Sequence, residues 1–428
     1  MKNLFEILKK PIVQVSSLNA VSVVIRIFGG LIVAKAIAAY VGAAGLAVVE
    51  NMRKFLTPVE SFATVGMQNG IIKYVAENQK KEKQLYSVLA TVFLSIFIVV
   101  ICFSLLLFLL SGYCSEWIFR DYEQYAWVFK VLAFSLPWYA GSLIFIAILN
   151  GFGDYKKVIR LNISGNITGV LLSVFLMWKF QTSGALLGLI LFQAVFFIFT
   201  FYVIWQRFNG FPFLSLKYFD KAILKGLLSY SFMSLFSAVL LPVVAITINN
   251  KLIDDFSFET AGLWSAMNRL SSFYMMFAST MLTVYFLPKL SVASTISETK
   301  HVFASYYKSM LPLFAIGLAI LYFLREFVVL FIFKEEFLPM TELFLWQLLG
   351  DFFKVGSLIL GYQFFAKKLT TAFVVTETIS SLILLASSMF LITGFGVKGA
   401  VMGHAFTYLI YWIILVVYFR KMLIKLEK

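Results

Sequence analysis

Charged residues are scarce in this chain. Only 13% of its 428 residues are Asp, Glu, Lys or Arg, whereas 61% are hydrophobic, and the mean hydropathy is +0.90. Ordinary globular domains contain about 25% charged residues. A core of this size cannot hide so much apolar surface from water. The composition therefore excludes a water-soluble enzyme or a nucleic-acid-binding protein, despite a formal net charge of +15.

Cysteine and histidine are also scarce, with two residues of each. Cys102 lies inside an apolar run and Cys114 just beyond its end, roughly 18 Å away along a helix, so we expect no disulfide. His301 and His404 are too few for a metal cluster, and we expect no metal and no other cofactor. His404 lies in the last apolar segment, where an interhelical hydrogen bond and a proton-linked role both stay open.

Long apolar segments are what the chain has instead. A membrane-spanning helix needs roughly 20 residues, and twelve candidates are present. They cover residues 12–39, 46–72, 85–110, 124–149, 158–178, 184–206, 222–249, 260–287, 302–324, 340–366, 371–393 and 398–419. The second is the least apolar, so we expect a hydropathy scan to miss it. The first meets Arg26 early, which favours a retained helix over a cleaved signal peptide.

Basic residues alternate between the connections of these segments. If the N-terminus is cytoplasmic, the seven inner segments hold most of the loop Lys and Arg, and the six outer loops hold few. Positive charge favours the cytoplasmic side of a membrane. We therefore predict an all-α polytopic membrane protein with twelve transmembrane helices and both termini in the cytoplasm. Most of the net charge then reflects topology and attraction to anionic membrane lipids, with no nucleic-acid partner.

Short motifs recur at an offset of about 215 residues. Ala-Gly-Leu occurs at 44–46 and 261–263, and Gly-Ala-x-x-Gly at 184–188 and 399–403. The repeat unit is six helices, an even number, so both halves have the same orientation and are related by a pseudo-two-fold axis along the membrane normal. We predict two pseudo-symmetric six-helix lobes. The N-lobe covers 1–206, a cytoplasmic interlobe linker 207–221, and the C-lobe 222–428.

Several arginines lie within the predicted spans. A charge at a helix centre costs roughly 2.5–3.5 kcal/mol, so each needs a partner or a water-filled cavity. Arg53 and Arg269 follow the two Ala-Gly-Leu motifs, and pseudo-symmetry predicts that they face each other, with Arg26 deeper. Guanidinium groups bind phosphate through a planar fork of donors. We predict an anion site at these three residues; the alternatives are solvated ion pairs and, for Arg26, a structural pair with an acid.

Other polar residues inside the spans form two further groups of candidates. Candidates for gating or proton coupling are Glu60, Asp351, Lys354 and Glu377. For Asp351 and Lys354, mutual neutralisation is the simpler alternative. Asn162 and Asn166 share one face of the fifth predicted helix and are candidates for glycan contacts, with ordinary interhelical hydrogen bonding as the alternative.

Four stretches carry a resemblance to a known family. The most specific is Trp-Gln-Leu-x-Gly-Asp-x-x-Lys-Val-Gly at 346–356. The others are Gly-Gly at 29–30 followed by Lys35, Val-Gly-x-x-Gly-Leu at 41–46 and Gly-Ile-Ile-Lys-Tyr-Val-Ala at 70–76. With them the chain resembles, over essentially its whole length, the Wzx-type flippases of lipid-linked oligosaccharides, which serve O-antigen and enterobacterial common antigen. That family belongs to the multidrug/oligosaccharidyl-lipid/polysaccharide (MOP) exporter superfamily.

The resemblance implies both a fold and a function. It implies two six-helix lobes in a MATE-like V shape and alternating access, in a transporter rather than an enzyme. The implied substrate is an undecaprenyl-pyrophosphate-linked oligosaccharide, moved from the cytoplasmic to the periplasmic leaflet of the bacterial inner membrane. The polymerase and chain-length regulator of the same pathway are implied partners. Lipid II flippases place cations on helices one, two and eight, where Arg26, Arg53 and Arg269 fall, but typically have fourteen spans.

Two other functions and two driving forces stay open. A cation-coupled multidrug exporter of the same superfamily would need a net acidic cavity, whereas the charges inside these spans are mostly basic. A membrane polymerase or ligase would need longer outer loops and a nucleophile–base group. Moving two negative charges outward at about 100 mV releases roughly 4–5 kcal/mol. The membrane potential is thus one candidate driving force, and protonation of Glu60, Asp351 or Glu377 is the other.

Overall fold

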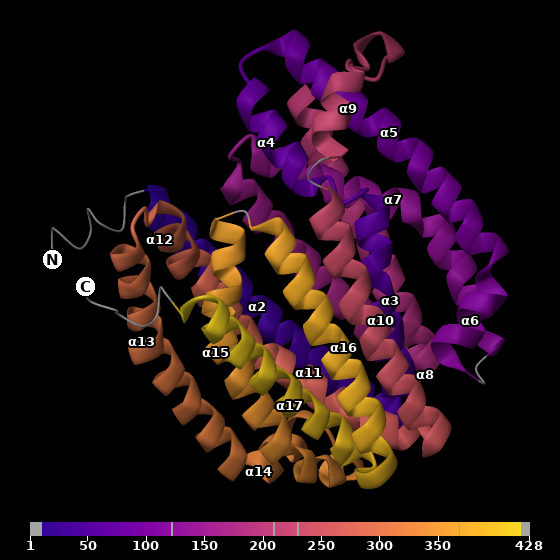
Figure 1. Ribbon diagram of the computed structural model, residues 1–428. Coiled ribbons are helices and arrows are strands. Elements are labelled where there is room, and N and C mark those ends of the chain that lie inside the picture. Colours follow the sequence, from indigo (N-terminus) through magenta and orange to yellow (C-terminus); the bar gives the residue numbers. More distant parts are fainter. Residues whose placement is uncertain (1–10, 121–122, 209, 229–230, 368, 421–428) are drawn as a thin grey trace, which may run out of the picture. The chain divides into compact units, whose positions relative to one another are not determined.

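A computed structural model describes residues 11–120, 123–208, 210–228, 231–367 and 369–420 (Figure 1). These residues are helical almost throughout and contain no strand. The longer helices are α2 (Pro11–Tyr40), α3 (Gly42–Ala63), α5 (Glu82–Leu109), α7 (Ala126–Gly151), α8 (Tyr155–Phe208), α10 (Ser231–Asp255), α11 (Phe258–Met281), α13 (Ile296–Phe323), α15 (Phe344–Ala366), α16 (Thr370–Phe395) and α17 (Val397–Tyr418). The predicted cytoplasmic ends, 1–10 and 421–428, lie outside the described residues.

Short helices connect or extend the long ones. They are α4 (Gln68–Asn78), α6 (Ser111–Phe119), α9 (Lys221–Leu228), α12 (Leu287–Val292) and α14 (Arg325–Ile332), with 3-10 turns η1 (Glu123–Tyr125), η2 (Leu216–Tyr218) and η4 (Glu335–Leu343) and a π-helical segment η3 (Leu282–Phe286). Helices α6 and α14 occupy the two longest predicted outer loops.

The predicted class, an all-α polytopic membrane protein, is confirmed. In the part of the chain that the structure describes, nine helices are long and apolar enough to span a membrane. One of them, α8, is two helices, because Gln181 has non-helical dihedral angles. α3 and α11 have 22 and 24 residues but are more polar, as expected for α3. These helices match the predicted segments in order, and the number of spans stays a prediction.

The second predicted helix is shorter than the sequence indicates. We expected residues 46–72, but α3 ends at Ala63 and α4 begins at Gln68. Between them Val65 and Gly66 have φ angles of 52° and 61°. A Cβ atom on Gly66 would lie 2.8 Å from the carbonyl oxygen of Ser231, so only glycine fits this turn. Apolar residues continue through the break, which hides it from periodicity.

By packing, the chain divides into two compact units. The first comprises residues 1–41 and 51–239, and the second 42–50 and 240–428. The start of α3 belongs to the second unit, where the backbone N–H of Ala43 donates to Oε1 of Glu336 at 2.9 Å. A Cβ atom on Gly262 would lie 1.9 Å from the carbonyl oxygen of Ala43. The predicted lobes 1–206 and 222–428 stay a prediction.

Residues of the predicted linker 207–221 pack inside the first unit. Phe213 is fully buried. Its ring stacks on Phe93 of α5 at 5.4 Å between centroids and meets Phe208 edge-on at 5.2 Å. Phe211 stacks on Phe145 of α7. This aromatic burial ties the segment to α5, α7 and α8, which explains why the first unit extends beyond residue 221.

The hairpin within α8 forms around the first Gly-Ala-x-x-Gly motif. Gln181 breaks the helix with φ 49° and ψ −125°. Added Cβ atoms on the two motif glycines would meet the other arm: Gly184 lies 1.9 Å from the carbonyl oxygen of Leu176, and Gly188 lies 2.9 Å from Oγ of Ser173. Both glycines therefore let the two arms of α8 approach closely.

The second motif forms the same hairpin from α16 and α17, which run side by side (Figure 1). Gly396 has φ 59° and ψ −143°. A Cβ atom on Gly399 would lie 2.2 Å from the carbonyl oxygen of Leu391, and one on Gly403 would lie 2.6 Å from Oγ of Ser388. Because each contact has its counterpart in α8 at the same spacing, the repeated motif marks one hairpin design used in both units.

Candidate functional site

Arg269 forms a buried ion pair in the second unit. Its Nη1 donates to Oε1 of Glu50 at 2.5 Å, with side-chain exposures of only 5% and 10%. The contact forms because Gly262 lets α11 approach the start of α3. The two residues are 219 positions apart in the sequence. A buried negative charge therefore offsets one of the three predicted phosphate ligands.

Asp351 is the centre of a buried polar cluster in the same unit. The residue is fully buried on α15. Its Oδ2 accepts hydrogen bonds from Ser271 Oγ at 2.7 Å and Tyr274 OH at 2.5 Å, both on α11. Gln347 Nε2 donates to the same oxygen at 3.2 Å, and His404 Nε2 of α17 lies 3.0 Å from Oδ1. Four donors from three helices thus converge on one carboxylate.

A glycine lets His404 reach this carboxylate. A Cβ atom on Gly350 would lie 2.3 Å from Cδ2 of His404 and 3.0 Å from the backbone of Ala405. Helices α15 and α17 therefore touch at Gly350, one residue before Asp351. Any larger side chain would push His404 away from its partner.

Lys354 lies one helical turn beyond Asp351 and extends the cluster. Its Nζ sits 4.9 Å from the ring centroid of Tyr408, and Tyr408 packs edge-on against His404 at 4.8 Å. The ammonium group also lies within electrostatic range of Asp351 and of Glu377 on α16. The second unit therefore brings together three of the four gating or proton-coupling candidates.

The fourth such candidate, Glu60, lies in the first unit. Its carboxylate accepts a hydrogen bond from the hydroxyl of Tyr139 on α7, a residue that is 1% exposed. Asn162 and Asn166 lie half-buried on α8, with Nδ2 of Asn166 donating to the carbonyl oxygen of Asn162 at 2.7 Å. Their role as glycan contacts stays a prediction.

The predicted arginine cluster draws on both units. Arg26 on α2 and Arg53 on α3 belong to the first unit and are exposed. Arg269 belongs to the second unit and is buried. An exposed guanidinium group in an apolar span favours a water-filled surface around it. Whether the three groups bind one anion stays a prediction.

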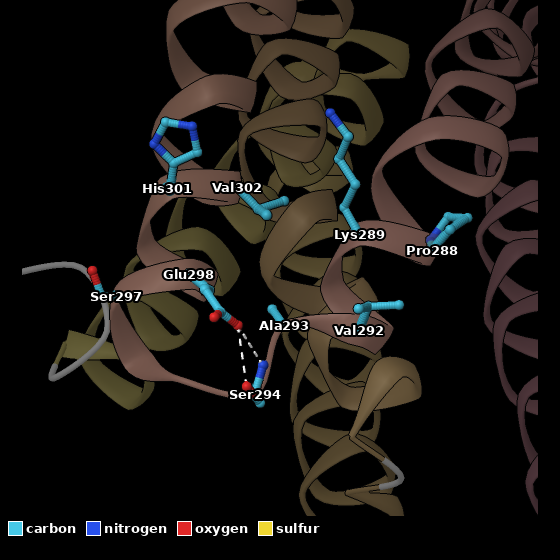
Figure 2. Close-up of a pocket in the computed structure, with 9 residues that line it drawn as sticks. All are labelled: Pro288, Lys289, Val292, Ala293, Ser294, Ser297, Glu298, His301 and Val302. Atoms are coloured by element: carbon cyan, nitrogen blue, oxygen red, sulfur yellow. Dashed lines mark hydrogen bonds between the residues drawn. The ribbon is translucent and has the colours of Figure 1, made fainter.

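One hollow of about 910 Å³ lies where α12 meets α13 (Figure 2). Lys289 and His301 line it, but its polar centre is a helix cap. Glu298 turns toward Ser294 and accepts hydrogen bonds from its N–H at 2.7 Å and its hydroxyl at 3.3 Å. Thr295 completes a capping box, a common way to satisfy the first N–H groups of a helix. These contacts explain the arrangement without a ligand.

In the described part of the chain, no group of three or more His, Cys, Asp or Glu side chains lies close enough to hold a metal ion. Cys102 and Cys114 are both free thiols.

The sequence identified the charged residues of the site but not the residues that pair with them. It singled out Asp351 but not Ser271 or Tyr274, which are ordinary residues of α11 with no motif around them. For His404 it left two roles open, an interhelical hydrogen bond and a proton-linked function. For Arg269 a signal existed, because both Ala-Gly-Leu motifs precede charged residues at matching depth. Pairing with Glu50 follows from the contact between those motifs.

Comparison with known proteins places the chain in a sequence family. Residues 52–342, more than half of the chain, match the polysaccharide biosynthesis protein family. The chain is 28% identical over 398 residues to the lipid III flippases of Escherichia coli (strain K12) and Shigella flexneri. The match covers 92% of this chain and 94% of each of those proteins.

Solved structures share the fold at low sequence identity. A multidrug resistance MATE family transporter of the MOP superfamily, in an inward-facing conformation, matches with a TM-score of 0.80 and 12% identity, covering 93% of this chain and 97% of that one. The lipid II flippase MurJ, in an inward closed conformation, matches with a TM-score of 0.76 and 15% identity, covering 96% and 88%. The fold is therefore that of the MOP transporters, and by its sequence the chain belongs to the polysaccharide biosynthesis protein family.

Proposed function

We propose that this protein is a flippase that moves an undecaprenyl-pyrophosphate-linked oligosaccharide from the cytoplasmic to the periplasmic leaflet of the bacterial inner membrane. The observation that carries this proposal is the similarity to lipid III flippases over 92% of the chain. The MurJ-like fold supports it independently, because that protein is also a lipid flippase. Alternating access, with both termini in the cytoplasm, is the mechanism that fits a fold of this superfamily.

Arg26, Arg53 and Arg269 hold the pyrophosphate group in this proposal. Arg26 on α2 and Arg53 on α3 are exposed, and guanidinium groups bind phosphate through a planar fork of donors. The Glu50 carboxylate occupies the Arg269 fork in the present structure. A phosphate oxygen competes for the same donors, so Glu50 acts as an internal anion that keeps Arg269 neutralised until the substrate arrives.

The remaining candidates contact the sugars or control access. Asn162 and Asn166 offer amide groups to the glycan from α8. Glu60, Asp351, Lys354 and Glu377 are the candidates for gating or proton coupling. No covalent chemistry is needed, so the protein works as a transporter rather than an enzyme. The polymerase and chain-length regulator of the pathway receive the product and are the expected partners.

A cation-coupled multidrug exporter is the second candidate, because a MATE transporter matches the fold with a TM-score of 0.80. The sequences separate the two functions. Identity to that transporter is 12%, against 28% to the flippases. Basic residues also outnumber acidic ones inside the predicted spans, which suits an anionic substrate better than an organic cation.

Reconstitution tests the function. Proteoliposomes receive a fluorescent undecaprenyl-pyrophosphate disaccharide, and its appearance in the opposite leaflet is measured by access of an impermeant quencher. Arg53→Glu should slow flipping by 10-fold or more, because a charge-assisted hydrogen bond contributes about 1.5–3 kcal/mol. Lys80→Glu, on an exposed connection, is the matched charge-reversal control. Normal flipping by Arg53→Glu would disprove the anion site, and export of organic cations without lipid flipping would favour the second candidate.

A further inference from the structure

His404 is a titratable group in the middle of a buried cluster. It lies about two turns inside α17 and meets the buried carboxylate of Asp351 at 3.0 Å. Histidine is the side chain whose charge ordinarily changes between about pH 5 and 8. An imidazole held against a carboxylate inside a membrane protein therefore places a proton-binding group where charge is costly.

The hydrogen bonds show where an additional proton can go. Asp351 accepts bonds from the hydroxyls of Ser271 and Tyr274, from the amide of Gln347 and from the imidazole of His404. Because all four partners donate, protonating the carboxylate would cost it at least one of them. For His404 Nε2 to donate, it must carry a hydrogen atom, which leaves Nδ1 as the acceptor for an incoming proton. The proton site is thus the imidazole, with Asp351 as a fixed anion.

Charged and polar groups from several elements surround the pair of His404 and Asp351. Helix α15 contributes Lys354, α16 contributes Glu377, and α11 contributes only the neutral hydroxyl of Tyr274. The turn η4, which also packs against α17, contributes Glu342, whose carboxylate is paired with Lys398 at 2.8 Å near the start of α17. Counting Asp351, Glu377 and Lys354 as charged gives the cluster one net negative charge. A proton on His404 cancels it.

The cluster is joined to a proposed substrate ligand through α11. Arg269, which meets Glu50, lies two residues before Ser271, which meets Asp351. Helix α11 continues into the π-helical segment Leu282–Phe286, and such segments occur where helices bend or serve a functional site. A change in the bond between His404 and Asp351 therefore acts on the helix that positions Arg269.

We propose that His404 takes up a proton at Nδ1 and that this proton controls how firmly α15 and α17 hold α11 during transport. The protonated imidazole makes a charge-assisted bond to Asp351, which is stronger than the neutral one. When His404 loses this proton, its bond to Asp351 weakens. The cluster then loosens, and α11 is free to move. The proton-binding step stands by itself, and the coupling to transport rests on the proposed flippase function.

Direct titration tests the proton site without any transport assay. The chain has two histidines, so the His301→Gln variant of the full-length protein in nanodiscs leaves one imidazole for ¹⁵N NMR. Its signal should change between the neutral and the protonated form as the pH is lowered over the range in which the protein stays folded. The transition should shift when Asp351→Asn is added. An imidazole that stays neutral throughout, or a transition that Asp351→Asn does not move, would overturn the proposal.

Proteoliposomes test the coupling. The rate of flipping the fluorescent undecaprenyl-pyrophosphate disaccharide is measured with and without a pH gradient, with the potential clamped at zero, and the ratio is compared between variants. His301→Gln should keep the wild-type ratio of the two rates. Tyr274→Phe should lower this ratio, and His404→Gln should lower it to one. A wild-type ratio in His404→Gln would refute the coupling. Absence of flipping by the wild type would refute the flippase function and leave the NMR titration to decide the proton site.

Discussion

Removing one partner of the buried pair between Glu50 and Arg269 should destabilise the protein far more than removing both. The two groups meet at 2.5 Å with side-chain exposures of 10% and 5%. Glu50→Gln or Arg269→Gln alone leaves a charge buried without its counterion, which costs about 3–5 kcal/mol. The double variant buries two neutral amides that can bond to each other, so we expect a loss of at most about 2 kcal/mol.

The double-mutant cycle gives the interaction energy between the two residues. Each variant is unfolded in mixed micelles with rising SDS, and tryptophan fluorescence reports the transition. We expect the losses of unfolding free energy in the two single variants to sum to about 4 kcal/mol or more above the loss in the double variant. The matched control is the pair between Glu342 and Lys398, which meet at 2.8 Å but are 64% and 48% exposed. Exposed pairs contribute about 0.2–1 kcal/mol, so its cycle should be nearly additive.

Two results would refute this account. Additivity within about 0.5 kcal/mol for Glu50 and Arg269 would mean that the pair is not buried in solution. A double variant as unstable as the singles would mean that shape, rather than charge, holds α3 against α11. The same double variant also separates structure from transport. If this variant folds but flips the lipid substrate at least 10-fold more slowly than the wild type, Arg269 binds the substrate in addition to pairing with Glu50.

Three further predictions concern local packing, each measured by the same unfolding assay. Gln181→Gly should stabilise the protein by about 1 kcal/mol or more, because φ 49° strains any side chain, and Gly396→Ala should destabilise it similarly. Gly350→Ala should cost about 1–3 kcal/mol, since its Cβ would lie 2.3 Å from a histidine ring atom, whereas Gly317→Ala, with open space around it, should be neutral or stabilising. Tyr139→Phe should cost about 1–3 kcal/mol by leaving a half-buried carboxylate without its donor. Equal effects of Gly350→Ala and Gly317→Ala, or no effect of Tyr139→Phe, would contradict these contacts.

The helices could be predicted because their signals are local. Apolar length reveals a span wherever it occurs, and alternating loop charge supports the order of the spans. Breaks are harder to predict when they lie inside an apolar stretch. The break at Gln181 lies in the predicted connection between residues 178 and 184, as the polar residues there indicate. Val65 and Gly66 lie inside the predicted second helix, where apolar residues continue through the break.

The candidate site was predicted only as far as single residues allow. A charged residue inside an apolar span can be recognised from the sequence alone, so Asp351 and Arg269 could be predicted as site residues. Their partners depend on which helix faces which, and that depends on small residues such as Gly350 and Gly262. A glycine in a membrane helix is common, so its position carries little information until the neighbouring helix is known.

The two matching hairpins carry different residues at one position. Leu189 follows the last glycine of the first motif, and His404 follows the last glycine of the second. The two hairpins have matching backbone contacts but differ in this side chain. The first hairpin therefore provides a reference without an ionisable group. Replacing His404 with leucine would give the second hairpin the apolar residue of its counterpart.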